Sequence, residues 1–338
     1  MAMTIYDISK KAGVSIATVS RVLNGSENVR PSTRKKVMDV IDKYDYTPNA
    51  FARGMGLHSL KTIGILCADS SDLFLAKAVY FLEQELQANG YESLLCCTGY
   101  NPDIKKNYLN LILSKKVDSI ILVGSHFIGF NEDENQYIKD VSTQVPIMLL
   151  NASFDHPNVY STLCDDYGTM FEAATEMIQS GITDILYLYD SKSYSGLKKL
   201  HGFCDAMKEH NIPGFEKLIH FYDGNIEHLN EVADFVARIV TKGTSFHGIM
   251  TSDDSLAIGS IKYAQKKGIR IPEELSVMGY NNSMLTNCCT PELTSVDNRL
   301  ETLTHQLVQT LLGVLAGEEM PKKSIFSGKI IKRGTTLF

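Results

Sequence analysis

Apolar residues near the N-terminus recur at helical spacing and predict two short helices. Thr4 is expected to cap the first helix with its hydroxyl, with Asp7 in the first turn, and Gly13 is expected to end it. The inner stripe of this helix consists of Ile5, Ile8 and Ala12. Ser15 then caps a second helix that runs over about 16–23. Two short helices joined by a glycine-containing turn indicate a helix-turn-helix.

The second predicted helix, within VSIATVSRVLNG, is apolar or small-sided on both of its faces. The face that packs against the first helix consists of Val19, Val22 and Leu23. The opposite face consists of Ile16, Ala17, Ser20 and Arg21. In a helix-turn-helix such a face lies in the DNA major groove, where Arg21 can donate to guanine O6 and N7. The alternative is a small three-helix core in which Arg21 is an incidental surface residue.

A third helix is predicted after Pro31-Ser32. Its inner positions are Val37, Val40, Ile41 and Tyr44, and its outer, basic positions are Arg34, Lys35 and Lys36. The basic side chains suit contacts with DNA phosphates. In the segment 46–56 that follows, Gly54 and Gly56 each destabilise a helix by about 1 kcal/mol relative to alanine. This segment is therefore expected to be marginal when free and to order on a partner.

From residue 62 onward, apolar runs alternate with helical patterns. Apolar runs typical of buried parallel strands occur at 63–67, 119–123, 146–150, 185–189, 248–250 and 276–280. Helical patterns lie between them, for example at 74–88 and 101–114. This alternation predicts a doubly wound α/β architecture, and more than 250 residues favour two such layers over one. Ligands of open α/β sheets bind beyond the carboxyl ends of the strands, here 69–74, 124–126, 151, 252–253 and 280–282.

The amino-acid composition is that of an ordinary globular protein. The chain has 338 residues, 44% hydrophobic and 21% charged, as in ordinary globular proteins. No apolar run approaches the ~20 residues of a membrane span, so we expect a cytoplasmic protein without membrane contact. The seven cysteines lack the spacing of metal ligands, so we expect no bound metal. We also expect no cofactor. For Cys96-Cys97 and Cys288-Cys289, small core-filling thiols are favoured over a redox switch.

Charge is distributed unevenly along the chain. Residues 1–60 carry nine Lys and Arg against five Asp and Glu, a net charge of +4, whereas the remainder carries −10. A basic N-terminal module on an acidic body indicates that only the module meets a polyanion.

The runs YDISKKAGVSIATVSRVLNG, VRPSTRKKV and YDYTPNAFARGM resemble the LacI/GalR family of bacterial transcriptional repressors. The resemblance implies a headpiece over 1–47, a hinge helix over 48–60 and an effector-binding core over 61–338. In the family an apolar hinge residue, usually Leu, wedges into the minor groove, and here that position is Met55, accompanied by Arg53 near the backbone. The DNA-contacting residues expected from pattern and resemblance together are Thr4, Ser15, Ile16, Ala17, Thr18, Ser20, Arg21, Asn24, Arg34, Asn49, Arg53 and Met55.

The resemblance extends through GIMTSDDSLAIGSI, GIRIPEELSVMGYNN, PELTSV and KRGTT. It implies two Rossmann-like lobes like those of periplasmic sugar-binding proteins, joined by a three-strand crossover. One lobe would span about 61–161 and 291–320, and the other about 162–290 and 321–338. The effector-contacting residues expected in the cleft are Asp72, Phe74, Ser125, Asn151, Lys199, Ser252, Asp253 and Asn281.

The pocket departs from the family at three positions. Ser252 stands where the family usually has Asn, Asn281 where it has Asp, and Lys199 where it has Arg. Fewer acceptor charges with a retained cation predict an anionic effector, a sugar acid or a phosphorylated sugar, contacted by Lys199. The alternative is a degenerate pocket whose effector is a partner protein, or one that uses other residues.

The sequence contains little that indicates an enzyme. The chain has no G-x-G-x-x-G, P-loop or G-x-S-x-G motif, and the pairs Asp165-Asp166 and Asp253-Asp254 each open a predicted helix, where acidic residues are expected. We therefore predict a dimeric regulator, a repressor of carbohydrate-utilisation genes that binds a pseudo-palindromic operator. Helix 74–88 or the 280–289 loop would supply the dimer face, without a tetramer-forming tail. The alternative is a binding protein or enzyme on the same core whose N-terminal module does not read DNA.

Overall fold

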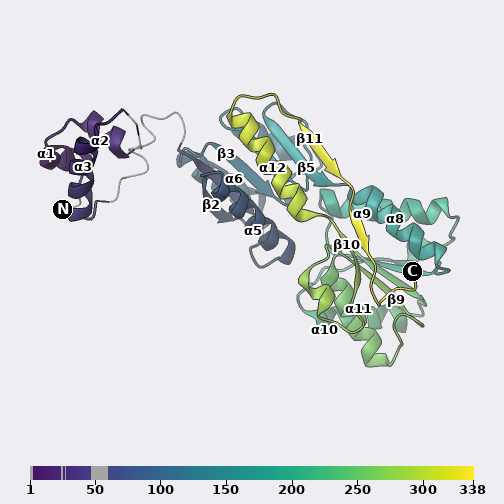
Figure 1. Ribbon diagram of the computed structural model, residues 1–338. Helices are drawn as coiled ribbons and strands as arrows, with labels where there is room; N and C mark the ends of the chain where they lie inside the picture. The colour runs from purple at the N-terminus through teal and green to yellow at the C-terminus, as the bar shows by residue number, and fades with distance from the viewer. Residues whose placement is uncertain (1–2, 24–25, 27, 47–59) are drawn as a thin grey trace.

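The computed structural model describes residues 3–23, 26, 28–46 and 60–338. These residues form a helical headpiece and an α/β core of two lobes, with the C-terminus on the second lobe (Figure 1). The predicted hinge helix falls on 48–60 and, apart from Leu60, lies outside the described residues. No helix of the described ranges is both long enough and apolar enough to span a lipid bilayer.

The headpiece consists of α1 (Ile5–Ala12), α2 (Ile16–Leu23) and α3 (Pro31–Lys43). Thr4 and Asp7 form a capping box at the start of α1, and Gly13 ends it in the left-handed conformation, as predicted. The buried core consists of Ile8, Val19, Val22, Val37, Ile41 and Tyr46. The prediction that Tyr44 belongs to this core is wrong, because α3 ends at Lys43 and the chain leaves helical register, so that Tyr46 points inward instead.

The first lobe is built on a parallel sheet in the order β11-β5-β4-β3-β1-β2. Its strands are β1 (Thr62–Cys67), β2 (Glu92–Cys97), β3 (Ser119–Val123), β4 (Ile147–Leu150), β5 (Val159–Cys164) and β11 (Lys323–Phe326). One face packs on α5 (Leu73–Ala88) and α12 (Leu300–Leu315), and the other on α6 (Pro102–Ser114) and α7 (Gln136–Ser142). Burial on both faces explains the continuous apolar runs of the central strands.

The second lobe repeats this plan with the order β12-β10-β9-β8-β6-β7. Its strands are β6 (Ile185–Tyr189), β7 (Ile219–Phe221), β8 (Gly248–Thr251), β9 (Ser276–Tyr280), β10 (Thr294–Asp297) and β12 (Lys329–Ile331). Helices α8 (Asp166–Gln179) and α9 (Tyr194–Glu209) cover one face, and α10 (Leu229–Thr241) and α11 (Asp254–Lys267) the other. All pairings are parallel except that of β12 with β10.

The chain passes between the lobes three times: after β5, after β10, and between β11 and β12. Two of the expected lobe boundaries need correction. Strand β10 was expected in the first lobe but pairs with β9 of the second, and β11 was expected in the second lobe but pairs with β5 of the first. Backbone hydrogen bonding decides which sheet a short strand joins, and the residue pattern of a four-residue strand carries no such information.

Candidate DNA-reading face and ligand cleft

The outer face of α2 is open to solvent. Val19 and Val22 on its inner face are buried, whereas Ser15, Ile16, Ala17 and Arg21 are exposed, and Thr18 and Ser20 are partly so. The Ser15 hydroxyl accepts a hydrogen bond from the Thr18 amide at 3.2 Å and lies 2.9 Å from the Thr18 hydroxyl, which fixes the start of the helix. An apolar and small-sided surface of this kind, carrying one guanidinium, has the shape and chemistry of a helix that enters a groove.

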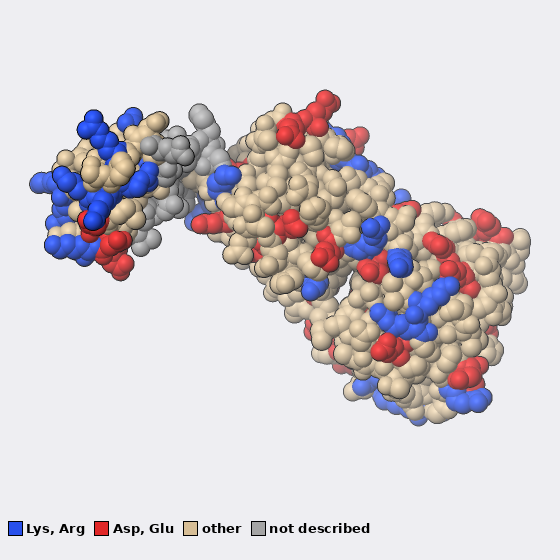
Figure 2. Space-filling view, in the orientation of Figure 1, with Lys and Arg blue, Asp and Glu red and all other residues tan. Residues whose placement is uncertain are grey.

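Lys and Arg side chains are numerous on the visible side of the headpiece (Figure 2). Lys35 and Lys36 are exposed on α3, but the Arg34 guanidinium donates to the carbonyls of Ser26 at 2.5 Å and Val22 at 3.4 Å. Arg34 therefore fastens α3 to the end of α2, and its contact with a phosphate stays a prediction. Tyr6, an aromatic side chain on α1 that was not among the expected DNA contacts, is 68% exposed. The predicted contacts Asn24, Asn49, Arg53 and Met55 lie outside the described residues.

A cleft of about 810 Å³ opens at the carboxyl ends of both sheets and continues into an inner pocket of about 90 Å³. The eight residues expected to contact an effector all line the inner pocket. They come from both lobes: from loops that follow β1, β3 and β4 and the first turn of α5 in the first lobe, and from loops that follow β8 and β9 and from α9 in the second. The rule that ligands bind beyond strand ends thus located one contiguous cavity from segments far apart in the sequence.

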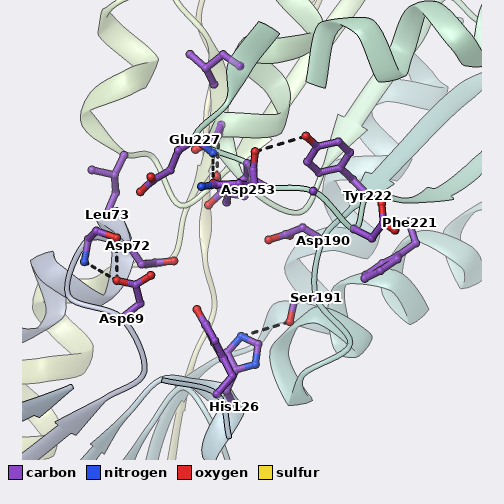
Figure 3. Close-up of a pocket in the computed structure, with 18 of the residues that line it drawn as sticks. Asp69, Asp72, Leu73, His126, Asp190, Ser191, Phe221, Tyr222, Glu227 and Asp253 are labelled. Carbon is purple, nitrogen blue, oxygen red and sulfur yellow. Dashed lines mark hydrogen bonds between the residues drawn. The ribbon is translucent and has the colours of Figure 1, made fainter. Parts of the chain in front are cut away.

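Six of the residues that line the cleft carry carboxylates. Asp72 of the first lobe and Asp190 and Asp253 of the second point toward the same space, with Asp69 beside them (Figure 3). Burial, together with the charges of Asp190 and Asp254, raises the pKa of Asp253 to about 7. Burial also raises the pKa of Asp72, whereas hydrogen bonds from Ser71 hold the pKa of Asp69 below its usual value.

Hydrogen bonds occupy several of the polar groups that the sequence assigned to the ligand. The Ser252 hydroxyl donates to Asp190 at 2.7 Å, and the Asn281 amide donates to Asp253 at 2.8 Å. Lys199 is buried, and its Nζ donates to the Ser252 carbonyl at 2.9 Å. The Asn151 side-chain oxygen, in contrast, is buried in the inner pocket without a hydrogen-bond partner among the described residues. It is an acceptor ready for a ligand hydroxyl.

Two contacts join the lobes across the cleft. The Ser125 hydroxyl of the first lobe donates to the Ser193 hydroxyl of the second at 2.8 Å, and His126 Nε2 lies 3.5 Å from the Ser191 hydroxyl. The Tyr100 ring packs edge-on against the His126 ring, with 4.8 Å between the ring centres. Burial, with the neighbouring Lys105, lowers the pKa of His126. A neutral imidazole that lies near a hydroxyl and packs on an aromatic ring suits a polar, uncharged ligand.

Three further residues line the cleft that were not expected there from the sequence: Asp190, Tyr100 and Phe221. Asp190 directly follows β6, so the strand-end rule could have found it. Phe221 ends the three-residue strand β7, too short for a recognisable pattern, and Tyr100 follows the edge strand β2, whose exposed positions obscure the apolar run.

Replacing Asp253 by asparagine is expected to stabilise the protein in a pH-dependent way. The pKa of Asp253 is about 7 in the folded chain against a usual 3.8, so its contribution to folding becomes unfavourable as pH rises through this range. Asp253→Asn should therefore raise the free energy of unfolding by roughly 2 kcal/mol more at pH 8 than at pH 5. Denaturant unfolding at the two pH values measures the difference.

Asp69→Asn is the matched control. The pKa of Asp69 is lowered in the folded chain, so the ionised form contributes stability above pH 4 and its removal should give no gain at pH 8. Equal effects of Asp253→Asn at both pH values would contradict the burial-driven shift.

Comparison with known proteins identifies the family. Residues 4–49 match the lacI family of bacterial regulatory proteins, and residues 174–336 match the periplasmic binding protein-like domain. An HTH-type transcriptional regulator of Lachnoclostridium phytofermentans is 50% identical over 336 residues, which cover 99% of this chain and 100% of that protein. The chain belongs to the lacI family. It is a DNA-binding transcriptional regulator, and its relatives are regulators rather than enzymes, as the sequence predicted.

Two further similar proteins share less sequence identity with the chain. Catabolite control protein A of Priestia megaterium is 33% identical over 303 residues, covering 88% of this chain and 87% of its own length. A crystal structure described as the lac repressor dimer bound to operator and an anti-inducer superposes over 100% of both chains with a TM-score of 0.87 at 21% identity. This likeness establishes the fold of a headpiece joined to a two-lobed core.

Proposed function

We propose that this regulator binds a pseudo-palindromic operator as a dimer and represses transcription, with its DNA affinity set by a neutral oligosaccharide in the cleft. The observation that carries the ligand proposal is the set of carboxylates that converge on one cavity from both lobes (Figure 3). The DNA-reading proposal rests on the exposed outer face of α2 in a basic headpiece. Such a regulator would act in the cytoplasm, beside the chromosome.

Acceptor groups in the cleft favour a ligand with many hydroxyls. Asp72, Asp190 and Asp253 can each accept from a pair of sugar hydroxyls, and Asn151 offers an unpaired buried oxygen. Tyr100 and Phe221 add aromatic faces for the apolar side of a sugar ring. A cavity of about 810 Å³ is large for a single ring and admits a disaccharide or longer chain.

This proposal replaces the sugar acid or sugar phosphate expected from the sequence. The ammonium of Lys199 already lies 3.8 Å above the centre of the Tyr280 ring and donates to Ser252, so little of its charge is directed at a ligand. An anionic group entering the cleft would instead approach the charges of Asp69, Asp72 and Asp190. Like charges at short range in a partly dry site repel by several kcal/mol.

Exposed apolar side chains support the dimer. Leu73 and Tyr80 of α5 are 42% and 52% exposed, and Met284, in the predicted 280–289 loop, is 69% exposed. These two segments are the ones expected to form the dimer face, and exposed apolar side chains are typical of protein interfaces. A twofold pair of headpieces would match the two half-sites of an operator.

A thermal-shift comparison tests the ligand class. The full-length protein is heated at pH 7.5 with neutral gluco- and xylo-oligosaccharides, and in parallel with gluconate and glucose 6-phosphate. A ligand at 100 times its Kd adds about 2.7 kcal/mol, a rise in Tm of several degrees. The proposal expects a neutral oligosaccharide to produce this rise, and Asp190→Asn to reduce it while the exposed control Lys198→Met does not.

Two results would overturn parts of the proposal separately. A shift produced only by the anionic compounds would replace the neutral ligand by the anionic one. DNase footprinting on genomic fragments tests the DNA-reading proposal. If no defined site is protected, α2 is not the element that reads the operator, whatever the ligand.

A further inference from the structure

Two cysteines meet side by side at the ends of β1 and β2. Cys67 and Cys97 are register partners in this parallel strand pair, and their sulfur atoms lie 3.7 Å apart. Neighbouring strands are about 4.7–4.9 Å apart, which falls within the Cα separation that disulfides span, about 4.4–6.8 Å. A bond between these sulfurs therefore needs a side-chain adjustment and no displacement of a strand.

The two thiols differ in access to solvent. Cys67 is buried in the core of the first lobe. Burial, and to a smaller extent the contact with Cys97, raises the pKa of the Cys67 thiol to about 12. Cys97 is exposed at the end of β2, the edge strand of its sheet. The prediction of a core-filling thiol is therefore wrong for Cys97, and also for Cys288, which is exposed. A dissolved oxidant reaches Cys97 first, with Cys67 already in contact behind it.

The backbone that follows each cysteine runs into the ligand cleft. The Thr98 amide donates to the Cys67 carbonyl at 2.9 Å, and the Gly99 amide donates to the Ala68 carbonyl at 2.8 Å. Beyond these bonds, one segment supplies Asp69 and Asp72 to the cleft and the other supplies Tyr100. A covalent link at the strand ends would tie these two cleft segments together.

We propose that Cys67 and Cys97 form a reversible disulfide on exposure to a hydroperoxide and that this bond restrains the cleft segments 68–72 and 98–101. The Cys97 sulfur attacks one peroxide oxygen, the O–O bond breaks, and Cys97 becomes a sulfenic acid with release of one water. The Cys67 sulfur then displaces the hydroxyl as a second water and forms the S–S bond. The two thiols lose two electrons and two protons, and hydrogen peroxide is reduced to two waters.

Thiol counting on the full-length protein tests the bond. After treatment with one equivalent of hydrogen peroxide and denaturation, free thiols should fall from the seven of the sequence to five, and dithiothreitol should restore them. Cys96→Ser, the neighbouring control, should fall from six thiols to four, whereas Cys97→Ser should keep six. Tandem mass spectrometry should find the peptides of residues 62–77 and 78–105 joined through Cys67 and Cys97.

Hydrogen–deuterium exchange tests the link to the cleft without any ligand. Oxidised wild-type protein should exchange amides of 68–72 and 98–101 more slowly than reduced protein, and peroxide-treated Cys97→Ser should show no such slowing. The consequence for effector binding rests on the proposed function, but neither readout requires a sugar, so the two proposals fail independently.

Three outcomes would overturn the inference. Wild-type protein that keeps seven thiols forms no disulfide. A bond through Cys96, or a non-reducing gel band of twice the chain mass, assigns the reactivity to another pair. A disulfide that leaves exchange in both segments unchanged removes the coupling to the cleft.

Discussion

Arg21→Ala should weaken operator binding by about 1–3 kcal/mol and relax the sequence preference at one base pair per half-site. Arg21 is exposed on the outer face of α2, while Val19 and Val22 hold the opposite face in the headpiece core. A guanidinium that donates to O6 and N7 of one guanine loses both bonds when it is truncated, and other bases at that position lose less. Binding titrations with a library of operators that vary one base pair at a time measure both effects.

Lys35→Ala is the control for this prediction. Lys35 is exposed on α3, and a phosphate contact made by its ammonium would be independent of base sequence. Its loss should lower affinity for every operator by about the same factor and reduce the salt dependence of binding. If Arg21→Ala lowered all affinities equally, as Lys35→Ala is expected to do, the outer face of α2 would not be reading bases.

Lys199→Met should destabilise the core by about 3 kcal/mol, even though methionine retains most of the side-chain length. The buried Lys199 ammonium stacks on Tyr280 and lies near the carboxyls of Asp166 and Asp254. Burial raises the pKa values of both carboxyls, and the positive charge of Lys199 opposes that rise. Asp166 also accepts from the hydroxyls of Tyr280 at 2.7 Å and Ser195 at 2.5 Å. Removing the cation leaves buried negative charge uncompensated, which is a costly change.

A double-mutant cycle separates this charge effect from lost packing. Lys199→Met with Asp166→Asn should be less destabilised than the sum of the single variants by about 1 kcal/mol, because each single variant leaves one charge of the pair unpaired and the double variant removes both. Lys198→Met changes the adjacent exposed lysine of α9 and should stay within about 0.5 kcal/mol of wild type. Strict additivity in denaturant unfolding would show that Lys199 acts through packing alone.

Local patterns in the sequence were sufficient for the headpiece and for the position of the cleft. The capping box at Thr4, the left-handed Gly13 and the apolar stripes are interactions between residues close along the chain, so composition and spacing determine them. Polar residues after buried strands indicated the cavity, because parallel strands of one sheet end at the same edge. Seven of the eight residues expected in the pocket lie at such strand ends and line it for that reason, whereas Lys199 of α9 was expected from the family resemblance.

The electrostatic character of the cleft depended on the tertiary structure. In sequence, Lys199 indicated an anionic ligand, but folding places its ammonium against Tyr280 and Ser252 and brings Asp72 of one lobe toward Asp190 and Asp253 of the other. The sheet to which β10 and β11 belong, and the contact of Cys67 with Cys97, are likewise pairings between distant segments. The sequence by itself determined the headpiece helices, the buried central strands and the edge of each sheet at which the cleft opens. Only the tertiary structure decided which charges face one another, because that depends on contacts that no local pattern encodes.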